Sequence, residues 1–193
     1  MPALGVRLTL RIKVPHLAVR SLFAEATLQG ATLCCKHLEK GFEMADLQAA
    51  AKRVARFREV MAQRGYDAVV LRHNPDLRWL TDAERVFDFE QAHTAFITQD
   101  GLFMHTDSRY YNTFLERLGA DSPWKFDQEV ATPTEWVAAH IAEARARVVA
   151  IEDTVDLAFF DGLEQALRDR SVAALLPRMH GDIAELRIVK DPA

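Results

Sequence analysis

Short β-rich runs alternate with amphipathic helical segments along most of the chain, and this alternation limits the folds open to it. Residues 67–72 form an apolar run rich in Val, which is typical of a buried strand. The segment before that run places Leu47, Ala50 and Val54 on one helical face. Repetition of this pattern predicts an α/β fold, because each helix can cover one face of a common sheet.

Helix boundaries are marked by capping residues. Asp46 is placed to cap the first helix and Gly65 to end it. The strongest start signal is Thr132, which is followed by Pro133 at the first helical position and by Glu135, which completes a capping box. By similar reasoning, further helices are expected near residues 75–81, 108–118, 156–169 and 181–190.

The expected strands include one hairpin. Asp100 and Gly101, a strong turn pair, separate the β-rich runs 93–98 and 102–106. Other strands are expected within 125–130, 147–153 and 171–177. Because most of the strands alternate with helices, we predict a three-layer α/β/α domain with a mixed, mainly parallel sheet that contains one β-hairpin.

Charge divides the chain near Met44. Residues 1–43 hold six basic and three acidic residues, leaving 18 of the 24 basic and 25 of the 28 acidic residues for the remainder. We therefore expect an N-terminal extension, 1–43, outside the fold, and a domain spanning 44–193. The extension has the basic composition of an organellar transit peptide, or it is the translation of an upstream start codon with Met44 as the natural beginning.

Composition also restricts the partners and the location. A net charge of −4 gives no reason to expect nucleic acid or an anionic membrane as a partner. No apolar run approaches the ~20 residues of a membrane span. Cys34 and Cys35, the only cysteines, are adjacent and have no distant partner, which favours a reducing, cytoplasmic location.

Motifs for common chemistry are absent from the sequence. It contains no phosphate-binding GxxxxGK[ST] loop, no GxGxxG, no HExxH, no GxSxG and no CxxC. His93, Asp107 and Ser108 are the residue types of a hydrolase triad, but Asp107 and Ser108 stand where a helix begins and are expected as caps. We therefore expect no catalytic residue and no metal ligand in this chain.

Three carboxylates offer one alternative. Glu152, Asp153 and Asp156 cluster where a strand meets a helix, the end of an α/β sheet at which ligands bind. Such a cluster could hold Mg²⁺. Acidic residues are also favoured at a helix N-terminus by the backbone dipole, and this reading needs no metal.

An acidic loop, residues 84–91, carries the best candidates for contact. Arg85, Phe87 and Phe89 lie in it. Aromatic residues in a loop suggest that it binds a partner, but they could equally fold back onto the edge of the domain.

In their order and spacing, several segments resemble the N-terminal domain of the creatinase, prolidase and aminopeptidase P metallopeptidases. The strongest are the Asn-Pro and Trp-Leu-Thr run within 74–81, the Asp-x-Arg-Tyr run at 107–110 and the Glu-Leu-Arg-x-Val-Lys run at 185–190. The resemblance covers residues 46–193. One departure is Asp82, where family members often have Gly.

The resemblance implies that catalysis belongs to a second domain. In this family the catalytic domain begins after the closing Lys-x-Pro segment, so we expect it beyond Ala193. Its two divalent metal ions (Mn, Co or Zn) and their ligands, two Asp, one His and two Glu, map onto no residue of this chain. The parent protein is then a metallopeptidase, and this chain alone is expected to be inactive.

By resemblance, the domain would help to build a homodimer and would shape access of Xaa-Pro substrates to the catalytic domain of the same parent. Arg85, Phe87, Phe89, Arg109 and Tyr111 are the candidate contacts. Arg109 could pair with a substrate carboxylate, or with a nearby carboxylate of its own domain. A freestanding interaction module and an accessory domain of a creatinase-like amidinohydrolase are the alternatives.

Overall fold

The computed structural model describes residues 44–87, 90–127 and 130–188. The expected N-terminal extension, residues 1–43, lies outside the described residues. The elements alternate as predicted: α2 (Leu47–Arg64), β1 (Ala68–Leu71), α3 (Asn74–Thr81), β2 (His93–Thr98), β3 (Leu102–Thr106), α4 (Ser108–Leu118), β4 (Lys125–Asp127), α5 (Pro133–Ala144), β5 (Val149–Ile151), α6 (Leu157–Asp169) and α7 (Asp182–Ile188).

The sheet has five strands in the order β4-β3-β2-β1-β5. β2 is antiparallel to both β1 and β3, while β1 is parallel to β5 and β3 is parallel to β4. The mixed sheet and its single hairpin, β2–β3, are therefore confirmed. Two of the four strand pairings are parallel, so the sheet is not mainly parallel as expected, because β2 is antiparallel to both of its neighbours.

A strand expected within 171–177 is reduced to two isolated parallel bridges. Leu175 pairs with Val148, and Arg178 pairs with Ile151. The backbone N–H of Val149 donates to the Leu175 carbonyl at 2.9 Å, and that of Ile151 donates to the Pro177 carbonyl at 2.8 Å. Pro177 has no N–H to donate, so the ladder is interrupted there.

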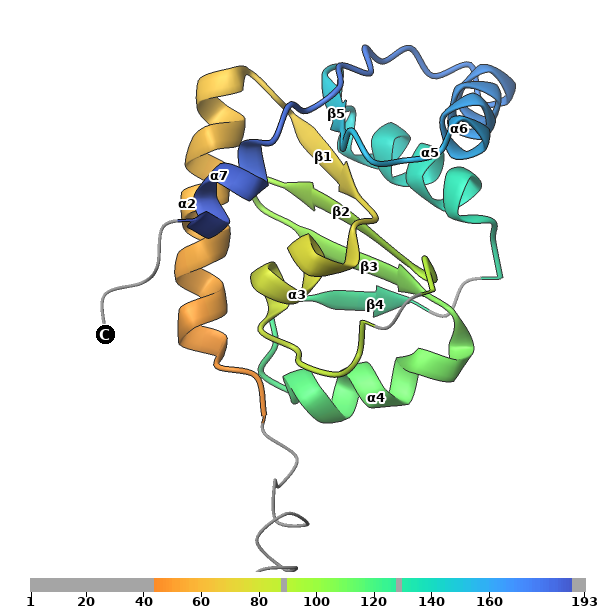
Figure 1. Cartoon of the computed structure of the whole chain (residues 1–193). Coiled ribbons are helices and arrows are strands. Elements are labelled where there is room, and N and C mark those ends of the chain that lie inside the picture. The colour runs from red at the N-terminus through yellow and green to blue at the C-terminus, as the bar shows by residue number, and fades with distance from the viewer. Residues whose placement is uncertain (1–43, 88–89, 128–129, 189–193) are drawn as a thin grey trace, which may run out of the picture. The chain divides into compact units, whose positions relative to one another are not determined.

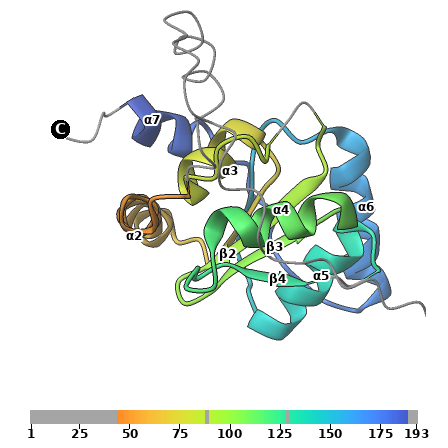
Figure 2. The same cartoon turned by 90° about the horizontal axis from the view of Figure 1, so that it is seen from below.

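The three layers are visible in two views (Figures 1 and 2). Figure 2 shows α2, α3 and α7 on one side of the sheet and α5 and α6 on the other. α4 contributes Phe114 to the core on the first side. β1 is fully buried along its length. Val69 faces the hydrophobic core on the side of α2, α3 and α7, and Val70 faces the core on the side of α5 and α6. A strand covered on both faces must be apolar at every position, which explains its sequence.

The predicted caps are confirmed. Asp46 accepts hydrogen bonds from the backbone N–H groups of Gln48 and Ala49, and Gly65 ends α2 in the left-handed conformation, with φ 71°. Thr132 and Glu135 form the expected reciprocal capping box at the start of α5. These local signals set the ends of the helices, and thereby the loops in which the candidate site lies.

Candidate functional site

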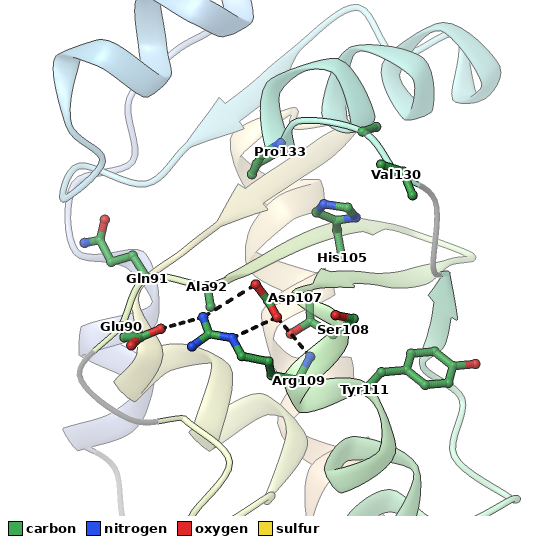
Figure 3. Close-up of a pocket in the computed structure, with 12 residues that line it drawn as sticks. Glu90, Gln91, Ala92, His105, Asp107, Ser108, Arg109, Tyr111, Val130 and Pro133 are labelled. Carbon is green, nitrogen blue, oxygen red and sulfur yellow. Dashed lines mark hydrogen bonds and ion pairs between the residues drawn. The ribbon is translucent and has the colours of Figure 1, made fainter.

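A hollow of about 690 Å³ opens where β3 leads into α4 (Figure 3). It is lined by the segment 90–92, by the end of β3 with the first turn of α4, and by the segment before α5. Arg109 and Tyr111, two of the expected contacts, both line it. Arg85 and Phe87 are not among its lining residues.

Arg109 is the central charge of this hollow. Its Nε lies 3.0 Å from Asp107 Oδ1 and its Nη2 lies 2.9 Å from Glu90 Oε2, as the dashed lines in Figure 3 mark. The guanidinium also lies over the Tyr110 ring, 5.4 Å from its centroid. Of the two roles expected for Arg109, the structure displays the internal ion pair, which ties the loop before β2 to the start of α4.

The electrostatics of the hollow follow from this arrangement. The backbone N–H and the guanidinium of Arg109 hold the pKa of Asp107 below its usual range. Hydrogen bonds to Asp107 and Glu90 raise the pKa of Arg109 above its already high value. The two carboxylates of the hollow, Asp107 and Glu90, thus both engage the Arg109 guanidinium.

Two of the candidate contacts in the loop 84–91, Arg85 and Phe87, differ in their exposure to solvent. Arg85 is exposed, with a left-handed φ of 63°. Phe87 is only 2% exposed, and its ring packs edge-on against His93 and Phe114 at centroid distances of 5.1 and 5.2 Å. Of the two alternatives left open for Phe87, the structure therefore shows the ring folded back into the core, and Phe87 is removed from the candidate surface contacts. Phe89 lies outside the described residues.

Sequence reasoning missed three side chains that hold this loop. Arg72 Nη2 donates to the Gln91 carbonyl, Asn74 Nδ2 donates to the Glu90 carbonyl and Arg78 Nη2 donates to the Phe87 carbonyl, each at 3.0 Å. Arg72 directly follows β1, and Asn74 and Arg78 lie on α3. The available signal was the placement of two arginines and an asparagine beside a fully apolar strand, where each needs a partner.

The carboxylate cluster is a structural feature rather than a magnesium site. Glu152 is only 4% exposed, and its Oε2 accepts from the backbone N–H groups of Arg72 and His73 at 2.7 Å each. Its Oε1 accepts from the Thr154 hydroxyl. Asp156 caps α6 by accepting from the N–H of Phe159 at 2.6 Å.

No other arrangement in the described residues offers a metal site. Across residues 44–87, 90–127 and 130–188, no three His, Cys, Asp or Glu side chains gather closely enough to hold an ion. His93 is fully buried, with its Nδ1 2.8 Å from Thr106 Oγ1. Asp107 is engaged by Arg109 and caps α4, which supports its expected structural role over a hydrolase triad.

Residues 53–189 match the model of the creatinase/prolidase N-terminal domain. The chain belongs to this family. Among curated proteins, none matches its sequence significantly.

Solved structures of peptidases share the fold of this creatinase/prolidase N-terminal domain. An aminopeptidase P from Streptococcus thermophilus aligns with a TM-score of 0.60 at 20% identity, over 72% of this chain and 98% of that one. The N-terminal domain of the cytoplasmic peptidase PepQ from Mycobacterium tuberculosis aligns with a TM-score of 0.58 at 19% identity, over 70% and 98%. An Xaa-Pro dipeptidase from Bacillus anthracis aligns with a TM-score of 0.61 at 18% identity, over 74% of this chain but only 37% of that one.

The structure gives physical roles to the segments that carried the resemblance. Arg187, in the closing run, lies 2.7 Å from Asp76 on α3, and Arg64 on α2 lies 2.8 Å from Asp182 at the start of α7. These ion pairs dock α7 on α2 and α3. Asp82 has a left-handed φ of 55°, which explains why glycine suits this position in the family.

Proposed function

We propose that this creatinase/prolidase N-terminal domain is the non-catalytic accessory module of a dinuclear-metal Xaa-Pro peptidase of the aminopeptidase P or prolidase kind. The observation that carries the proposal is the fold shared with peptidases of this group, among them an Xaa-Pro dipeptidase of which the chain spans 37%. The hydrolytic residues then belong to the remainder of the parent protein, and the domain alone is inactive.

The two divalent metal ions, Mn, Co or Zn, belong to the catalytic domain in this proposal. A two-metal site needs several carboxylate and imidazole ligands around ions about 3.5–4 Å apart. The described residues bring together no such set, and the acidic groups at Glu152, Asp156 and Asp107 are already engaged by backbone and side-chain donors.

The domain's contribution is to shape the approach to the active site. The hollow beside Arg109 and the loop held by Arg72, Asn74 and Arg78 form a rim whose backbone is fixed by side-chain hydrogen bonds. The exposed Arg85 and the half-buried Tyr111 on this rim are the groups that would meet the substrate or the catalytic domain. Arg109 orders the rim through Glu90 and Asp107.

The parent is proposed to work as a cytoplasmic homodimer. The adjacent Cys34 and Cys35, without a distant partner, suit a reducing compartment. Within the described part of the chain, no helix combines the length and the apolar character needed to cross a bilayer.

The size of the native protein tests this function. An immunoblot of source cells with an antibody against the domain should give a band of at least about twice 21.8 kDa, as the 37% coverage of the dipeptidase implies. A single band near 21.8 kDa would instead support a freestanding interaction module. The larger protein, once purified with Mn²⁺, should hydrolyse an Xaa-Pro peptide; turnover of creatine instead would indicate the amidinohydrolase branch.

Hydrolysis assays of the isolated chain provide a second test of the proposed function. The purified chain, 193 residues long, should show no hydrolysis of the same peptide above the blank at any concentration of Mn²⁺, Co²⁺ or Zn²⁺. Metal-dependent hydrolysis that copurifies with the chain would overturn the accessory role.

A further inference from the structure

One edge of the sheet is formed by residues 172–178, called here the outer edge. It lies beside β5 through the parallel bridges at Leu175 and Arg178. Leu175 uses both of its backbone groups inward: its N–H donates to the Arg147 carbonyl at 2.7 Å, and its carbonyl accepts from Val149. Met179 N–H also donates inward, to Ile151.

The alternate residues of the outer edge therefore direct their backbone groups away from β5. Within the described residues, the N–H groups of Ala174, Leu176 and Arg178 take part in no hydrogen bond. A row of unpaired donors and acceptors at a sheet edge is a template for pairing with another strand.

The side chains in the middle of this edge give it little protection. Residues 172–176 are Val, Ala, Ala, Leu and Leu, and the edge-blocking residues Pro177 and Arg178 stand only at its end. The opposite edge of the sheet, β4, is a three-residue strand that carries Lys125, a common means of blocking strand addition. Leu175 is 69% exposed.

An open groove lies along the same edge. It measures about 750 Å³ and is lined by α6 and the outer edge, with Phe160, Leu167, Val172 and Leu176 among its apolar residues. Arg147 and Arg168 line it together with Glu164, so both signs of charge are present. A surface that carries both signs and an apolar centre can complement a copy of itself across a two-fold axis.

We propose that the outer edge is a dimer interface, in which two copies pair antiparallel about a two-fold axis at Leu175. In this register Ala174 of each copy faces Leu176 of the other, and each such pair exchanges two N–H···O bonds. The two Leu175 residues face each other as a non-hydrogen-bonded pair, consistent with the inward direction of their own backbone groups. The proposal rests on the homodimer of the proposed function and assigns a surface to it.

A second copy fits this edge better than the rest of the parent chain does. Ala174 and Leu176 pack on the core that includes α5 and α6, whereas α7, the last described element, packs on the opposite face with α2 and α3 (Figure 2). The described chain therefore ends, at Ile188, on the face away from the groove. The self-complementary register about Leu175 needs only a copy of the same segment.

The first test measures association of the full chain by sedimentation velocity over roughly 1–500 µM, the range in which small interfaces associate. Wild type should shift from monomer to dimer. Leu175→Lys should raise the dissociation constant at least tenfold, because it places two like charges opposite each other. Leu157→Lys is the matched control: Leu157 is 68% exposed but lies at the start of α6, outside the outer edge, and should leave association unchanged.

The second test uses a disulfide. In a Cys34→Ser, Cys35→Ser background, Leu175→Cys should form a covalent dimer under mild oxidation, because directly opposed Cα atoms about 4.5 Å apart permit a disulfide. Leu157→Cys should form far less. A chain that stays monomeric throughout the concentration range, or that cross-links equally at both positions, overturns the proposal. Neither test depends on metal or hydrolysis, so failure of the peptidase assignment would leave the result standing, and the reverse holds too.

Discussion

The Glu152 carboxylate, just after β5, accepts a hydrogen bond of 2.7 Å from the backbone N–H of Arg72, just after β1. The same oxygen accepts from His73. The bond fixes the path of the chain as it leaves β1 and enters the segment that carries Asn74 and Arg78. One buried carboxylate thus sets the position of the donors that hold the candidate loop.

Replacing Glu152 by Ala should destabilise the domain by about 3 kcal/mol, because buried N–H groups lose their acceptor and the buried Arg72 guanidinium loses a nearby negative charge. Glu152→Gln should cost only about 1 kcal/mol, since its amide oxygen can still accept. Urea unfolding at constant m-value measures both. Asp153→Ala, at an exposed neighbouring carboxylate, should stay within about 0.5 kcal/mol. Equal effects at the two positions would refute the role of Glu152.

Asp82 allows the family's glycine to be tested directly. Its left-handed φ of 55° strains a residue with a Cβ, but its carboxylate pairs with Arg53 at 2.8 Å and accepts from the N–H of Asp46 at 2.8 Å. Asp82→Gly relieves the strain and loses the contacts, so we expect a change within about 1 kcal/mol. Asp82→Ala keeps the strain and should be about 1 kcal/mol less stable than Asp82→Gly. Thermal unfolding that ranks the two variants equally would show that the backbone is unstrained.

Local signals in the sequence predicted most of the fold. Asp46, Thr132 with Glu135, and the Asp100-Gly101 turn each act within a few residues, so the helix starts and the hairpin could be read directly. The strand expected at 171–177 failed in part, because Pro177 and the pairing with β5 determine its length, and neither pattern nor propensity reports on pairing.

The candidate site was harder to predict because its contacts join distant segments. Arg109 and Tyr111 were found from the first turn of α4, but Glu90 reaches Arg109 from 19 residues away. For Phe87, partner contact and folding back onto the domain were both open from the sequence, and in the structure the ring completes a cluster with His93 and Phe114. The local sequence does not show whether a hydrophobic side chain in a polar loop is buried in the core or exposed.

Acid should weaken the connection between β1 and β5. Asp67 Oδ2 accepts from the N–H groups of Val148 and Arg147 at 2.9 and 2.8 Å, and these bonds hold the pKa of Asp67 below its usual value. A depressed pKa contributes stability that is present above the unfolded value of about 3.9 and is lost as the pH falls through the folded value. Asp67→Asn should therefore be less stable than wild type at pH 7, and the gap should narrow as the pH falls below the unfolded value of about 3.9. Urea midpoints across this range measure it; a gap that stays constant with pH would show that the carboxylate charge is not responsible.

The three donors on β1–α3 should control the opening of the candidate loop more than the stability of the whole domain. Asn74→Ala removes the donor to the Glu90 carbonyl, a bond worth about 1 kcal/mol. Amide hydrogen exchange at residues 84–87 and 90–91 should then quicken about fivefold, as expected for local opening eased by that amount. Amides of β1 and β5, which belong to the buried sheet, should exchange as in wild type. Arg85→Ala, at an exposed residue of the same loop, should change neither set. If exchange became faster in β1 and β5 as well as in the loop, Asn74 would support the stability of the whole domain. Its bond to Glu90 would then not control opening of the loop separately.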